Sequence, residues 1–140
     1  MQAMSQDETT RSRVSSGVKW EPIIGYSRAV RVGRQVFVAG TTSTDAAGNI
    51  VGKGDAAAQM RQVLANIERA LDLSGARMTD VVRTRIFVTD IAQWESIGRV
   101  HGEVFHAIRP AATMVEVKRL IDPDLLVEVE VDAVIGSGDA

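Results

Sequence analysis

The sequence predicts one α/β domain, of the α+β arrangement, in which a single sheet with the element order ββαβαββ carries two helices packed on one face. Three observations predict this class. The chain has 140 residues, the usual size of one domain. Its hydrophobic fraction of 45% and charged fraction of 24% are typical of globular proteins. The spacing of its apolar residues changes along the chain between a period of two and a period near 3.6, the periods of strands and of helices.

We place the domain at residues 18–135. The segment before it, Met1–Gly17, is polar and lacks the apolar run of a secretory signal, so we expect a disordered tail. Residues 136–140 are expected to form a short C-terminal tail. A further strand near Val18–Trp20 is compatible with the pattern.

The first two strands are predicted to form a hairpin. Ala29–Val32 and Val36–Ala39 are short β-prone runs on either side of Gly33-Arg34-Gln35, a spacing typical of a tight glycine-containing turn. A loop over residues 41–54 follows.

Two amphipathic helices are predicted. The first begins after Asp55 as N-cap and ends at Gly75. The second begins at Asp90, which forms a capping pair with Gln93, and ends at Arg109-Pro110. Apolar faces with helical spacing are formed by Met60, Val63, Leu64, Ile67 and Leu71 in the first helix and by Trp94, Ile97, His101, Val104, Phe105 and Ile108 in the second.

Three more strands are predicted, at Val81–Val88, Thr113–Val117 and Leu125–Ile135. In the first of these, strict alternation places Val82 on the same face as Thr84, and Val81 on the other. Because both helices cover one face of the sheet, the opposite face stays bare, and a bare face of this size is unusual in a monomer. We therefore expect self-association.

The composition excludes several classes of protein. Cysteine is absent, which removes disulfides, thiolate nucleophiles and cysteine-based metal sites. His101 and His106 are five residues apart and do not share a helix face, so we expect no metal. A net charge of −2 without a basic stripe argues against a nucleic-acid partner. The chain has no apolar run long enough for a membrane span, and we expect a cytoplasmic protein.

The last predicted strand carries an acidic face formed by Glu128, Glu130 and Asp132, with neighbouring carboxylates about 6.7 Å apart. A carboxylate in a cleft can act as a general base or position a water molecule. The residues alone favour the other interpretation, in which this is the solvated face of an antiparallel strand.

Taken together, several segments resemble the Rid family (reactive intermediate deaminases, also called YjgF, with the older label endoribonuclease L-PSP). The resemblance extends from about Gly25 to Ala133 in one order with few gaps. It is carried by the segments Tyr26–Gly33, Val36–Gly40, Gln62–Ala70, Asp80–Asp90, Arg109–Val117 and Glu128–Glu130.

The resemblance implies a chorismate-mutase-like fold assembled as a homotrimer, with small-molecule clefts at the subunit interfaces. Active members of the family hydrolyse enamines and imines such as 2-aminoacrylate to 2-oxo acids and ammonia, without a cofactor. Carried over by position, the family's water-holding glutamate is Glu128, its tyrosine is Tyr26 and its cleft glycine is Gly40.

This sequence departs from the family at the arginine that holds the substrate carboxylate, because that slot is Ala112. The family's helix asparagine falls at Gly98, and the cysteine beside the arginine falls at Met114. Arg109, three residues before the slot, could compensate from another direction. Loss of a bidentate charge-assisted contact costs at least about tenfold in binding or rate.

The leading hypothesis is therefore a Rid-like deaminase or hydrolase acting on a small molecule other than a short 2-imino acid. The alternative is a ligand sensor or binding module without catalysis. An endoribonuclease or translation inhibitor is a third reading, against which the net charge argues.

Overall fold

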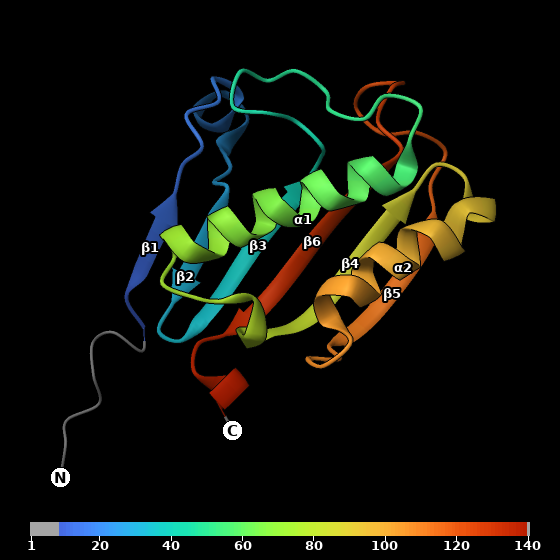
Figure 1. Cartoon of the computed structure of the whole chain (residues 1–140). Coiled ribbons are helices and arrows are strands. Elements are labelled where there is room, and N and C mark those ends of the chain that lie inside the picture. Colours follow the sequence, from blue (N-terminus) through green and yellow to red (C-terminus); the bar gives the residue numbers. More distant parts are fainter. Residues whose placement is uncertain (1–8, 140) are drawn as a thin grey trace, which may run out of the picture.

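The computed structural model describes residues 9–139 and contains one six-stranded sheet with both long helices on the same face (Figure 1). The strands lie in the order β1-β2-β3-β6-β4-β5. The predicted order ββαβαββ is confirmed, and one strand precedes it. The elements are β1 (Arg11–Val14), β2 (Ala29–Val32), β3 (Gln35–Thr41), α1 (Ala56–Leu73), β4 (Val81–Val88), α2 (Trp94–Phe105), β5 (Ala111–Glu116) and β6 (Val127–Val134).

The added strand, β1, corrects the prediction of a disordered tail over residues 1–17. Arg11–Val14 pairs antiparallel with β2, so that Arg13 lies opposite Val30. This strand has a weak sequence signal, because an edge strand is held by backbone hydrogen bonds and Arg-Ser-Arg-Val has one apolar residue. The strand considered near Val18–Trp20 is wrong: a short π-helix over Glu21–Gly25 follows directly. Residues 1–8 lie outside the described residues.

The boundaries of α1 are those predicted. The Asp55 carboxylate accepts a hydrogen bond from the Ala58 backbone N–H at 3.0 Å, and Gly75 beyond the helix has a φ of +85°, which suits glycine. The predicted apolar face is buried against the sheet, with Ile67 0% exposed. Since α1 lies over β3 and β6, it fills the middle of the core.

Helix α2 differs in detail from the prediction. Asp90 caps a 3-10 turn over Ile91–Gln93 by accepting from the Ala92 N–H, and the predicted pair with Gln93 does not form. Ile97, Val100 and Phe105 are buried, whereas Trp94 is 58% and Val104 36% exposed. The helical period identifies a face, but it cannot tell which positions along that face have a neighbour to pack on.

In β4 the predicted alternation fails at its first residues. The register with β6 shifts between Val81 and Arg83, so that Val81 is buried and Val82 is 40% exposed. A bulge of this kind inserts one residue and reverses the side-chain direction. From Thr84 to Val88 the alternation is as predicted.

The last two strands complete the sheet. Strand β5 runs parallel to β4 because α2 connects them as a crossover. Strand β6 lies between β3 and β4, and its apolar residues Val127, Val129, Val131 and Ala133 are at most 1% exposed beneath the helices. Its alternate residues Glu128, Glu130 and Asp132 point to the opposite side, which we call the open face.

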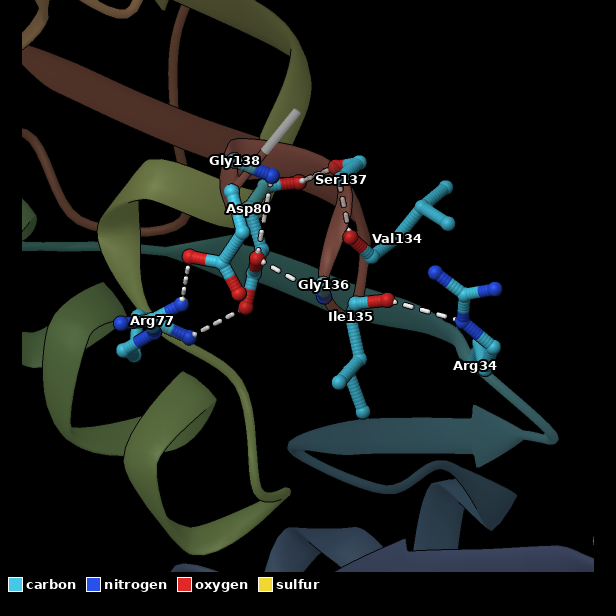
Figure 2. Close-up of polar contacts among 9 residues, drawn as sticks. Arg34, Arg77, Asp80, Val134, Ile135, Gly136, Ser137 and Gly138 are labelled. Atoms are coloured by element: carbon cyan, nitrogen blue, oxygen red, sulfur yellow. Dashed lines mark hydrogen bonds and ion pairs between the residues drawn. The ribbon is translucent and has the colours of Figure 1, made fainter.

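The predicted C-terminal tail is folded over residues 137–139, where Ser137–Asp139 forms a 3-10 turn (Figure 2). The buried Asp80 carboxylate accepts hydrogen bonds from the backbone N–H groups of Arg77 at 3.0 Å, Gly136 at 3.0 Å and Gly138 at 3.4 Å. One carboxylate therefore joins the start of β4 to the end of β6. Residue 140 lies outside the described part of the chain.

Candidate functional site

The open face carries a groove of about 730 Å³. The groove runs from the edge strand β1 toward the middle of the sheet. Its walls combine cationic, acidic and aromatic side chains from several strands. Its lining includes Arg11, Arg13, Tyr26, Ser27, Phe37, Ala39, Arg85, Glu130 and Asp132. An open groove with this mixture of groups suits a small polar ligand.

Two of the three β6 acids are neutralised by β4. The Arg85 guanidinium lies 3.4 Å from the Glu130 carboxylate and 3.2 Å from that of Asp132, and the Arg83 Nε lies 4.0 Å from Asp132. The Arg85–Glu130 and Arg83–Asp132 ion pairs join residues opposite each other in the sheet, and the Arg85–Asp132 pair is diagonal. The interpretation as a solvated strand face fits Glu130 and Asp132.

Glu128 is in a different environment. Its partner across the sheet is Phe87 instead of an arginine, and within residues 9–139 its carboxylate forms no ion pair. Burial raises the pKa of Glu128, the charge of Arg28 opposes that rise, and the neighbouring Glu130 adds to it. Among the described residues, Glu128 is thus the one of the three acids that combines partial burial with the lack of a contacting cation.

Gly40 lies directly beneath this carboxylate. The register between β3 and β6 is irregular between Val38 and Thr41, and Gly40 falls in that irregular stretch. A Cβ at Gly40 would overlap the Glu128 carboxylate. Glycine at position 40 therefore leaves room for the Glu128 carboxylate, and the structure brings together two residues that the sequence proposed separately.

Tyr26 and Arg28 complete this end of the open face. Tyr26 is 40% exposed and lines the groove. The Arg28 guanidinium donates through Nη2 to the Gly40 carbonyl oxygen at 2.6 Å. Sequence reasoning missed Arg28, although its position gave a signal: it stands one residue before Ala29, the buried first residue of β2, and alternation places its side chain on the open face.

The remaining predicted residues lie elsewhere. Ala112 pairs with Thr84, and Met114 with Ile86. The Thr84 and Ile86 side chains are buried toward the helices, so Ala112 and Met114 point to the helix side of the outer strand β5, away from Glu128. Arg109 is exposed in the turn before β5, with a φ of +54°.

The two histidines and the acids assemble no metal site. Across residues 9–139, no cluster of three or more histidine, aspartate or glutamate side chains could hold an ion. The His101 Nε2 lies 2.9 Å from the buried Thr84 Oγ1 under α2, and His106 is exposed. Over the same residues, neither long helix is apolar enough along its length to cross a bilayer.

Comparison with known proteins identifies the family. The family described as "Endoribonuclease L-PSP" matches residues 17–135. The chain belongs to this family, which is also called YjgF. Rv2704 from Mycobacterium tuberculosis, whose crystal structure is described as that of a YjgF/YER057c/UK114 family member, is 52% identical, with a TM-score of 0.82 over 90% of this chain and all of that one.

Two curated relatives are matched over most of their length. The uncharacterized protein SCO2049 of Streptomyces coelicolor is 36% identical over 91% of this chain and 95% of its own. The 3-aminoacrylate deaminase RutC of Acinetobacter baylyi is 37% identical over 77% of this chain and 85% of its own. The YjgF fold is thereby confirmed, together with the resemblance drawn from the sequence.

Proposed function

We propose that this chain is a cofactor-independent hydrolase of the YjgF family, which converts a small enamine or imine into a carbonyl compound and ammonia. The observation that carries the proposal is the Glu128 carboxylate, which is half-buried, lies against Gly40 and has no contacting cation among residues 9–139. The name of the RutC relative, a deaminase, supports hydrolysis of a carbon–nitrogen bond.

The chemistry requires one group that first accepts and then donates a proton. Glu128 accepts a proton from a water molecule as the water oxygen bonds to the imine carbon, and the π electrons of the C=N bond move to nitrogen. Glu128 returns that proton to the nitrogen, which gives a neutral carbinolamine. Glu128 then accepts the hydroxyl proton as the carbonyl forms and delivers it to the nitrogen, which leaves as ammonia when the C–N bond breaks. Because burial raises the pKa of Glu128, its proton affinity is closer to that needed near neutral pH.

The substrate differs from that of the arginine-bearing family members. Ala112 offers no charge and no hydrogen-bond donor at the slot that the resemblance assigns to the substrate carboxylate. We therefore expect inefficient hydrolysis of 2-aminoacrylate. Met114, next along the same strand face, presents a thioether and adds apolar surface.

We further propose that the cleft is completed by self-association into a cytoplasmic homotrimer. One chain places Glu128, Gly40 and Tyr26 on the open face but Ala112 and Met114 on the helix side of β5. A second copy whose β5 edge lies on the open face would bring the two groups together. Phe37 and Val115, both more than 40% exposed on the open face, provide apolar surface for that contact.

The activity test uses imines generated in place by an amino-acid oxidase, with ammonia and the carbonyl product measured. We expect turnover that Glu128→Gln lowers by about a hundredfold or more. Glu103→Gln, an exposed glutamate of α2 in an ion pair with Arg61, is the matched control and retains turnover. Full turnover in Glu128→Gln with loss in Glu130→Gln would assign the role to Glu130 instead.

The assembly test is the mass in solution. Light scattering should give three times the 15.1 kDa of one chain. A monomer at micromolar concentration would contradict the shared cleft. Binding of small carbonyl compounds without turnover of any imine would favour a sensor or binding module. The alanine at position 112, in the slot of the family's arginine, supports this alternative.

A further inference from the structure

Arg28 is fixed at the junction of three strands. Its backbone N–H donates to the Val14 carbonyl at the end of β1, and its carbonyl accepts from the Ala39 N–H in β3. Ala29, the next residue, is 1% exposed beneath α1, so the Arg28 side chain extends over the open face, beside Ala39 of the groove. The position of this guanidinium is therefore set by the backbone, unlike that of an arginine on a surface loop.

Most of the donor capacity of Arg28 is unused. A guanidinium carries five N–H donors in a planar fork. Nη2 is bonded to the Gly40 carbonyl, and Nε is buried without a hydrogen-bond partner among the described residues. Buried donors are rarely left unpaired in folded proteins, and an unpaired one calls for a water molecule or a ligand.

The nearby acids do not satisfy Arg28. Burial lowers the pKa of Arg28, and the negative charges of Glu21 and Glu128 oppose that effect, so both carboxylates lie within its electrostatic reach. Glu21 is instead held by the Ser16 N–H and hydroxyl. Glu128 forms no ion pair with Arg28 in the described part of the chain. A partly buried cation and a partly buried carboxylate thus face the same space on either side of Gly40 without contact.

We infer that Arg28 binds an anionic group of the ligand and so replaces, from the open face, the cation that Ala112 lacks. The inference rests on the proposed function, because it places the reacting carbon of that ligand at Glu128. The ligand class is a small carboxylic acid bearing an imine, enamine or carbonyl group. A carboxylate bonded to the free Arg28 donors is neutralised, and its C=N or C=O carbon extends across Gly40 toward the Glu128 oxygens.

The other cations near the groove are less suited to this role. Arg85 is engaged by Glu130 and Asp132. Arg11 and Arg13 are exposed on the edge strand β1, where water screens their charge. Arg109 lies at the start of β5, on the far side of β4 and β6 from Gly40. Arg28 alone among these combines burial, unused donors and proximity to Glu128.

The test measures binding of three oxo acids in which the carboxylate is one, two or three bonds from the carbonyl carbon: 2-oxobutyrate, acetoacetate and levulinate. Each is titrated beside its uncharged amide. We expect at least one acid to bind the native chain, with Arg28→Gln weakening it about tenfold or more and leaving the amide unaffected. The matched control is Arg31→Gln, three residues further along in β2 and on the helix side, where its guanidinium donates to the Gly33 and Ser74 carbonyls.

A second measurement does not depend on the variant folding. The ¹⁵N–¹H signal of the Arg28 Nε should shift on addition of the bound acid and stay in place with the amide. An unmoved signal, or equal affinity of the acid for the native chain and Arg28→Gln, would overturn the inference. Failure of the proposed function is distinguishable: Glu128→Gln would then keep full turnover while Arg28→Gln still lost affinity for the acid.

Discussion

The substitution Gly40→Ala tests whether the position of the Glu128 carboxylate, as well as its presence, is needed. An added Cβ would overlap the Glu128 carboxylate oxygen and lie 3.0 Å from Cδ and 3.4 Å from Cγ of the same side chain. These atoms are the far end of a flexible side chain, so the fold can accommodate alanine if Glu128 moves. We expect the free energy of unfolding to change by less than about 1 kcal/mol.

The catalytic effect should be much larger. A displacement of about 1 Å in a reacting group can cost about a hundredfold in rate. Rotation of the carboxylate away from Gly40 also returns it toward water, and its raised pKa should fall toward the ordinary value of glutamate. We therefore expect kcat for the imine substrate to fall about a hundredfold in Gly40→Ala, with a lower pKa for Glu128.

The assay combines steady-state ammonia release, an NMR titration of the Glu128 carboxyl carbon and chemical denaturation. Gly98→Ala is the control, since a Cβ there meets no atom within 4 Å and alanine favours the helix. The reasoning also requires that Gly40→Ala add little to the defect of Glu128→Gln, because both disable the same group. Native turnover and an unchanged Glu128 pKa in Gly40→Ala would refute it.

The remaining predictions concern pH and stability. Burial raises the pKa of Glu128, so between its unfolded and folded pKa values the folded chain holds a proton that the unfolded chain releases. The free energy of unfolding therefore falls as pH rises through that range. Glu128→Gln should abolish this fall in denaturation curves measured from about pH 4 to about pH 8. Ile67→Ala, at a fully buried position of α1, should lower the free energy of unfolding by about 2–5 kcal/mol, whereas Leu73→Ala, 59% exposed, should change it by no more than about 0.5 kcal/mol. Asp80→Ala leaves the Arg77, Gly136 and Gly138 N–H groups without their acceptor. It should lower the free energy of unfolding, measured by urea denaturation, by at least about 2 kcal/mol. A decrease below about 0.5 kcal/mol would show that water replaces the carboxylate.

Local rules account for the parts of the fold that could be predicted. The 18 residues of α1 carry an N-cap, a helical period and a terminal glycine that agree with one another, and its boundaries follow from them. The bulge at Val81 and the edge strand Arg11–Val14 depend on pairing with strands distant in sequence. No pattern within either segment specifies that pairing, so neither could be predicted.

The candidate site also has a part that could be predicted from the sequence and a part that depends on tertiary contacts. The acidic face of β6 could be predicted from a period of two, but the three acids were equivalent in sequence. Only their partners across the sheet distinguish them: arginines for Glu130 and Asp132, and Phe87 for Glu128. Arg28 was missed because alternation places its side chain on the open face but reveals neither its burial nor its unused donors.

The sequence by itself determined the element order, the family and the absence of cysteine chemistry, since each is written in local spacing or residue type. The tertiary structure decided which of the three carboxylates is desolvated, that glycine at position 40 leaves room for that carboxylate, and that Ala112 points away from Glu128. Desolvation and contact are properties of neighbours in space, and the neighbours Gly40 and Glu128 are 88 residues apart in the sequence.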